Sequence, residues 1–235
     1  MVLPMLGDEN FLALLTTLKL ATISTLFLIL LGTPLAWWLA HTRWKYRAII
    51  QALVALPLVL PPTVLGFYLL LALGANGPIG SAMLQLGYQP LAFTFTGLVI
   101  GSCIYSLPFV VQPLYHAFSN IGARPMELAA TLRACPIDRF FTVAVPLAGS
   151  GFITAAVLGF AHTLGEFGVV LMIGGNIPGE TQVLSIAIYE HVEVLEYQQA
   201  HLLSLGLLVL SFLMLVIVYG INHRFSLEQK IQHEH

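Results

Sequence analysis

The chain has 235 residues, of which 58% are apolar and only 9% are charged, with a mean hydropathy of +0.89 and a net charge of −2. A soluble domain has roughly 45–50% apolar and about 25% charged residues. The composition therefore excludes an ordinary soluble protein and predicts one that spans a membrane. The apolar runs are continuous rather than alternating, which also argues against a transmembrane β-barrel. We expect an all-α integral membrane protein, with a single domain over residues 1–235.

Five stretches are apolar and close to the roughly 20 residues that a helix needs to cross a bilayer. In chain order they are 17–40, 48–74, 91–117, 146–173 and 200–221. Lys19 interrupts the start of the first run, so we expect residues 10–19 to lie at the interface, with Lys19 reaching toward water. A sixth span would require residues 181–199 to re-enter the bilayer, and three glutamates there argue against it. Prolines at 56–62 and 107–113 predict kinks in the second and third spans.

The distribution of lysine and arginine predicts the orientation in the membrane, because cytoplasmic loops carry an excess of both. Eight of the nine basic residues follow the first, third or fifth span, all on one side: Arg43, Lys45, Arg47, Arg124, Arg133, Arg139, Arg224 and Lys230. The opposite loops contain acidic residues and no lysine or arginine. We expect the N-terminus outside and the C-terminus in the cytoplasm.

A charged segment separates the third and fourth spans, at about 119–145, and this topology places it in the cytoplasm. If 125–134 is helical, Leu128, Leu132 and Cys135 share one face, while Glu127, Ala130, Thr131 and Ala134 share another. Pro136 ends this helix, and a second short helix carries Phe140 and Phe141 for packing. The pattern predicts a helical hairpin that projects from the membrane; an ordinary solvated loop is the alternative.

Glu166 lies within the fourth span, where an uncompensated carboxylate is costly. His162 is one turn earlier on the same face, and we expect the two side chains to form a hydrogen bond. Gly151, Ala155, Gly159 and Thr163 repeat every four residues beside this face, a pattern that lets another helix pack closely. A metal site is disfavoured because the pair offers only two ligands. A proton relay and a buried polar group that fixes the bundle or lines a pathway remain as interpretations.

Several motifs are absent from the sequence. There is no GxxxxGK[ST] segment to hold ATP phosphates, no arrangement typical of a nucleophilic or paired-carboxylate enzyme, and no basic stripe for nucleic acid. We therefore expect no enzyme activity, no cofactor and no metal in this chain.

The hairpin resembles the EAA loop of the permeases of ABC importers. The residues that carry the resemblance are Glu127, Ala129, Thr131, Leu132, Ala134, Pro136, Phe140 and Pro146. Two positions depart from the pattern: Leu128 replaces a usual alanine, and Arg133 replaces a usual glycine that allows a bend. The segments 56–74 and 162–189, above all LGEFG and GNIPGETQ, are similar to the molybdate/tungstate permeases, whose close relatives are the sulfate permeases.

The resemblance implies a type I ABC importer permease (MetI-like) fold in a bacterial inner membrane. It implies a homodimer with two ATPase subunits, which carry ATP and Mg, and a periplasmic oxyanion-binding protein. Residues Glu127, Ala129, Ala130, Thr131, Arg133 and Ala134 would couple the permease to the ATPase, and His162, Thr163 and Glu166 would line the pathway or form a buried polar group. The Gly/Pro-rich outer loop with Asn176, Pro178, Gly179 and Glu180 could contact that binding protein or the substrate at the mouth of the pore, and a plain turn is the alternative there.

Three functional alternatives stay open. Molybdate, tungstate and sulfate share charge and near-tetrahedral shape, so the sequence does not choose among these oxyanions. An ion-coupled secondary transporter would use His162 and Glu166 as its relay. A membrane scaffold would dock a partner through the hairpin and transport nothing.

Overall fold

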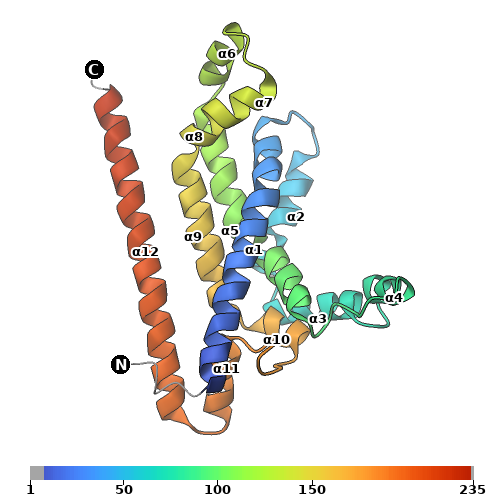
Figure 1. Ribbon diagram of the computed structural model, residues 1–235. Coiled ribbons are helices and arrows are strands. Elements are labelled where there is room, and N and C mark those ends of the chain that lie inside the picture. The colour runs from blue at the N-terminus through green and yellow to red at the C-terminus, as the bar shows by residue number, and fades with distance from the viewer. Residues whose placement is uncertain (1–7, 234–235) are drawn as a thin grey trace.

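The computed structural model describes residues 8–233, with side chains at residues 9–217, 219 and 220. All regular elements in that range are helical (Figure 1). Three long helices run the length of the molecule: α1 (Asp8–His41), α5 (Phe95–Ile121) and α12 (Tyr197–His233). The side chains of Arg224 and Lys230 lie outside the described part. Four helices in the described range are long and apolar enough to cross a membrane, and a bent pair over 136–164 makes a fifth candidate. These numbers agree with the expected five spans.

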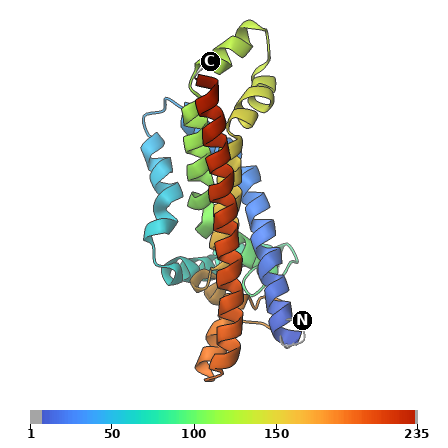
Figure 2. The same ribbon diagram turned by 90° about the vertical axis from the view of Figure 1, so that its left-hand side faces the viewer.

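The core of the bundle is formed by α1, α5 and α9 (Gly149–Leu164), which pack against one another, while α2 (Arg47–Val59) covers α5 and α12 packs on α9 (Figures 1 and 2). The largest apolar cluster joins Leu39 of α1, Val54 of α2 and Phe118 of α5. We call the end that carries the predicted hairpin the hairpin end, and the other the N-terminal end. The C-terminal end of α12 lies toward the hairpin end in both views.

The first span is one continuous helix. Residues 10–19, which we expect at the membrane interface, belong to the same helix as the apolar segment that follows them, because α1 is unbroken from Asp8 to His41. No proline or glycine lies between residues 8 and 31 to interrupt the backbone hydrogen bonds. Lys19 is exposed on this helix, and its Nζ atom lies 4.6 Å from the centre of the Phe95 ring.

The second predicted span is not one helix. α2 ends at Val59, and α3 (Pro62–Leu73) then leaves sideways and leads to α4 (Pro78–Gln85), as Figure 1 shows. Pro61 has no N–H to continue α2, and the ring of Pro62 restricts Pro61 to an extended conformation, with ψ of 134°. In α5, by contrast, Pro108 and Pro113 do not end the helix.

The fourth predicted span is broken twice. The chain bends by 72° between the segments 136–147 and 149–164. It leaves the helical conformation again between α9 and α10 (Gly168–Gly174), where Glu166 and Phe167 are non-helical. The sixth-span alternative also fails among the described residues, since 181–199 contains only α11 (Leu184–Glu193) and a turn into α12.

The small-residue stripe of α9 packs as expected. Gly151, Ala155, Gly159 and Thr163 are all buried. A Cβ atom at Gly151 would lie 2.3 Å from the Cβ of Ala117, and one at Gly159 would lie 2.6 Å from a methyl group of Val110. Both neighbours belong to α5, so the stripe is what allows α9 and α5 to approach closely.

Candidate functional site

The predicted hairpin lies at one end of the bundle and consists of α6 (Arg124–Thr131), α7 (Pro136–Arg139) and the π-helical turn η2 (Phe140–Ala144), which leads into α8 (Val145–Leu147) (Figure 1). Phe140 anchors it, with its ring centre 5.1 Å from that of Trp37 in α1 and 6.1 Å from that of Phe118 in α5. The Arg139 guanidinium donates a hydrogen bond of 3.5 Å to the carbonyl of Met126, which joins the two short helices. The hairpin is thus a packed element fixed to the bundle.

Four apolar side chains of the hairpin are exposed. Leu128 is 67% exposed and Leu132 is 82% exposed. Ile137 and Phe141 are also exposed, so only Phe140 of the predicted aromatic pair packs inward. We call Leu128, Leu132, Ile137 and Phe141 the apolar face. Cys135 does not belong to α6: it precedes α7, where its Sγ atom accepts a hydrogen bond from the N–H of Asp138.

Arg133 explains why α6 ends where it does. Its φ is +62°, in the left-handed region that favours glycine. The N–H of Arg133 donates to the carbonyl of Ala130, and the N–H of Ala134 donates to that of Ala129. These two bonds are the Schellman motif that closes many helices, usually with glycine at the left-handed position. The bend expected of a glycine is therefore made by Arg133, and it takes Cys135 off the α6 face.

The expected coupling residues do not all lie on one side of the hairpin. Glu127 and Ala130 line a cavity of about 420 Å³ at the base of the hairpin, together with His41 of α1 and Arg139 of α7. Thr131 and Arg133 are exposed, while Ala129 and Ala134 are partly buried. The Thr131 hydroxyl donates to the carbonyl of Leu128. The exposed Glu127 therefore stands beside this cavity, next in sequence to Leu128 of the apolar face.

The expected hydrogen bond between His162 and Glu166 is wrong. His162 Nδ1 lies 2.9 Å from the Ser106 hydroxyl, and its ring is stacked on Phe109 at 3.9 Å. The Ser106 hydroxyl also lies 3.0 Å from that of Thr163, which donates to the carbonyl of Gly159. His162 is still in α9, but the helix ends at Leu164, so the one-turn spacing to Glu166 does not hold.

Glu166 is 4% exposed, and neither carboxylate oxygen has a hydrogen-bond partner among the described residues. The Ser102 side chain of α5 lies beside it. The Ser102, Ser24 and Thr25 hydroxyls are likewise buried without partners there. An ionised carboxylate in such a place would be destabilising, because burial removes its hydration and one neighbouring hydroxyl does not replace it. The break between α9 and α10 is held instead through the backbone, since the Ser185 hydroxyl donates to the Glu166 carbonyl.

His162 and Glu166 do contribute to the same cavity. Both line a cavity of about 520 Å³, with Tyr105 of α5 and with Pro62 and Thr63 at the start of α3. The residues predicted from the sequence did not include Ser102, Tyr105, Ser106 and Phe109. Two serines four residues apart in an apolar helix were a usable signal, because such hydroxyls share one helix face and need partners.

The expected outer loop follows α10 at the N-terminal end. Pro178, Gly179 and Glu180 are exposed, and Asn176 is partly buried with φ of +55°. The loop is held from inside, because the Thr181 hydroxyl donates to the carbonyl of Gly174 and accepts from the N–H of Ile177. It is an ordered turn with three exposed residues at its tip.

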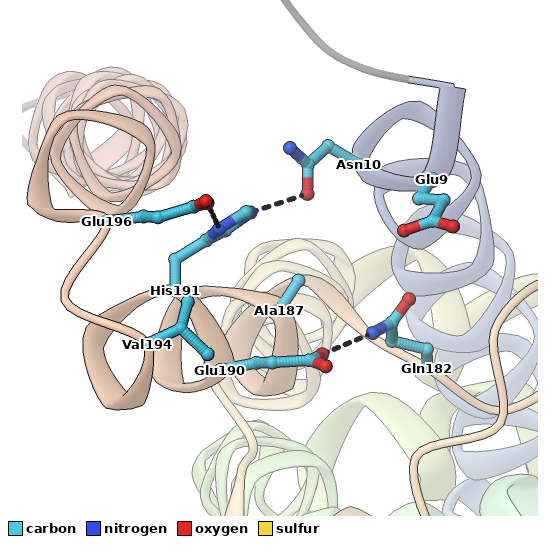
Figure 3. A pocket seen from close by; sticks show the side chains of 8 residues that line it. All are labelled: Glu9, Asn10, Gln182, Ala187, Glu190, His191, Val194 and Glu196. Atoms are coloured by element: carbon cyan, nitrogen blue, oxygen red, sulfur yellow. Dashed lines mark hydrogen bonds and ion pairs between the residues drawn. The ribbon is translucent and has the colours of Figure 1, made fainter.

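A polar pocket of about 400 Å³ lies next to this loop, between the first turn of α1, α11 and the start of α12 (Figure 3). Gln182 donates a hydrogen bond of 2.9 Å to Glu190. His191 lies between Glu196, at 3.0 Å, and the side-chain oxygen of Asn10, at 3.1 Å. These contacts tie the ends of three helices together.

Comparison with known proteins identifies the family. Residues 32–227 match the binding-protein-dependent transport system inner membrane component. The molybdenum transport system permease protein ModB of Azotobacter vinelandii is 59% identical, over 94% of this chain and 97% of that protein.

Two further proteins are more distantly similar to this chain. The sulfate transport system permease protein CysT of Salmonella typhimurium is 30% identical, over 89% of this chain and 76% of that protein. The crystal structure of the MetNI methionine ABC transporter, in inward-facing conformations, matches with a TM-score of 0.69 at 17% identity, over 92% of this chain and 97% of the matched chain. The structural match confirms the expected type I importer permease fold. The chain belongs to the family of inner membrane components of binding-protein-dependent transport systems.

Proposed function

We propose that this chain is the permease subunit of an ABC importer for molybdate. The observation that carries the transport role is the hairpin at one end of the bundle, whose apolar face and Glu127 are both exposed. The choice of oxyanion rests on similarity: the chain is 59% identical to a molybdenum permease and 30% identical to a sulfate permease. The family match supports neither of the other two alternatives, the ion-coupled transporter and the membrane scaffold.

The hairpin end faces the cytoplasm in this proposal. The turn between α1 and α2 carries Arg43 and Lys45, and the hairpin carries Arg124, Arg133 and Arg139, as the positive-inside rule requires. The start of α1 then lies outside, and α12 runs inward. The outer end carries Glu180, Glu190, Glu193 and Glu196 and no lysine or arginine beyond Lys19.

Two ATPase subunits bind the hairpin, one for each permease copy. ATP and Mg belong to those subunits, because this sequence has no phosphate-binding loop of its own. The apolar face fills a cleft of the ATPase, and Glu127 fixes the register of docking. Movement of the ATPase is transmitted through Phe140, which contacts both Trp37 and Phe118.

The translocation pathway lies between two copies of the chain. A single copy has few polar groups in its core, so it would not form a polar pore by itself. The cavity beside Tyr105, His162 and Glu166 faces the pathway in this arrangement. Glu166 is not a ligand for molybdate, since it would repel a dianion if ionised and is only 4% exposed. Glu166 lies in the break between α9 and α10, and it acts there as a hinge about which the two helices move.

A periplasmic binding protein delivers the oxyanion to the outer end. Pro178, Gly179 and Glu180 are exposed there on an ordered turn, which suits a docking contact better than a mobile loop would. The binding protein supplies most of the selectivity among oxyanions.

Competition in proteoliposomes tests the substrate. The permease is reconstituted with its ATPase and binding protein, and ATP-driven uptake of labelled molybdate is measured against excess tungstate or sulfate. We expect tungstate to compete and sulfate to compete weakly. Uptake of labelled sulfate that exceeds that of molybdate would assign the chain to sulfate instead.

A further inference from the structure

One groove on the surface of the bundle combines an apolar lining with a positive charge at one end. It lies between α1 and α5 and has a volume of about 550 Å³. Ile23, Phe27 and Leu31 line it from α1, and Val99, Ile100 and Ile104 from α5. Phe27, Leu31 and Ile104 are exposed, so the groove is open to its surroundings.

The charge belongs to Lys19. It precedes Ile23 by four residues, so Lys19, Ile23, Phe27 and Leu31 follow one face of α1 at a spacing of four. Phe95, over whose ring the Lys19 ammonium lies, is also part of the groove lining. Within the described part of the chain, Lys19 forms no ion pair. Its charge therefore stands at the end of the groove without a protein carboxylate to neutralise it.

The depth of Lys19 in the bilayer follows from the aromatic residues at the hairpin end. Trp38, Trp44 and Tyr46 are 41–48% exposed, as expected for an aromatic belt at one membrane interface. At 1.5 Å per residue, the 19 residues from Lys19 to Trp38 span about 28 Å, close to the roughly 30 Å of the hydrocarbon core. Lys19 is thus at headgroup level of the opposite leaflet, and the groove descends from it into the hydrocarbon region.

We propose that this groove binds an anionic phospholipid, with one acyl chain along Ile23, Phe27 and Leu31 and its phosphate on the Lys19 ammonium. The leaflet is the outer one if the hairpin faces the cytoplasm, and only that assignment rests on the proposed function. An acyl chain suits the lining because the groove is apolar below Lys19. An anionic lipid suits the mouth because the ammonium, held over Phe95, still has N–H donors for a phosphate.

Native mass spectrometry of the purified permease tests the site, with phosphatidylglycerol and phosphatidylcholine as probes. We expect the wild type to retain one phosphatidylglycerol per chain in preference to phosphatidylcholine. Lys19→Gln should lower this preference about fivefold, the effect of losing one basic residue at a membrane surface. Ile23→Trp, which fills the groove, should reduce retention of both lipids.

Two control variants match these changes. Lys45→Gln removes another lysine that lies over an aromatic ring, at 4.8 Å from the centre of Tyr46, but at the hairpin end. Leu26→Trp enlarges an exposed residue of α1 outside the groove. Both should leave lipid retention unchanged. An unaltered lipid preference in Lys19→Gln would overturn the proposal. The proposal would also be overturned if Ile23→Trp made the permease monomeric but did not reduce lipid retention. That result would show that a second copy of the chain, not a lipid, fills the groove.

Discussion

The Nδ1 atom of His162 lies 2.9 Å from the hydroxyl oxygen of Ser106, and this contact joins α9 to α5 beside the predicted pathway. The same hydroxyl reaches Thr163, so one serine serves two residues of the polar cluster. His162 is therefore fixed by α5 and not by Glu166, which leaves the Glu166 carboxylate without a partner among the described residues.

Ser106→Ala should destabilise the bundle by about 1–2 kcal/mol, because the half-buried His162 loses its hydrogen-bond partner. Thermal unfolding of the purified permease in detergent measures the change. Thr22→Ala is the control, since its exposed hydroxyl only donates to the carbonyl of Leu18 in the same helix. Equal midpoints for the two variants would show that the contact between α5 and α9 contributes nothing.

Gly159→Val should destabilise the bundle by about 1–3 kcal/mol through overpacking. The new side chain meets Val110, whose methyl group is 2.6 Å from the position of a Cβ atom at Gly159. Gly149→Ala in the same helix is the matched control, because a Cβ atom there meets nothing within 4 Å. The thermal unfolding midpoint of the purified permease measures this loss of stability. A midpoint for Gly159→Val equal to that of the wild type would contradict the close packing of α9 on α5.

Arg133→Gly should stabilise the end of α6 by about 1 kcal/mol, because glycine adopts a positive φ without the strain of a side chain. Arg133→Val should have the opposite effect. Hydrogen exchange at the N–H of Ala134, which closes the turn on Ala129, reports the change directly. Faster exchange in Arg133→Gly than in the wild type would mean that the arginine side chain holds the turn in another way.

Glu127→Lys should weaken association with the ATPase while the permease stays inserted and dimeric, since it reverses a charge at the exposed docking surface. Co-purification of the ATPase with the variant measures this. Glu180→Lys reverses a charge at the other end of the molecule and should leave co-purification unchanged. If both variants bind the ATPase as the wild type does, Glu127 has no part in docking.

The helical class, the five apolar segments and the hairpin were predictable because they depend on composition and on periodicity along the chain. The small-residue stripe of α9 was predictable for the same reason. The turn of the chain at Pro61 was not, because Pro108 and Pro113 show that proline alone does not end a helix here. The pairing of His162 was missed because Ser106 is 56 residues away, and only the packing of α9 on α5 brings them together.

The break before Glu166 had a weaker signal. Gly165 and Gly168 flank it, but glycine also occurs within the helical part of α9. Gly168 is needed there because a Cβ atom would lie 2.7 Å from Pro62 of α3, a contact that depends on the turn at Pro61. The glycine at position 168 is therefore explained by the packing of α10 on α3.

Uptake of molybdate into proteoliposomes shows whether this chain is the permease subunit of an ATP-driven importer. The permease is reconstituted with its binding protein, with and without the ATPase, and the Glu127→Lys variant is measured beside the wild type. We expect molybdate to accumulate only when both ATP and the ATPase are present, and Glu127→Lys to lower the rate. Uptake that persists at the same rate without the ATPase would contradict it.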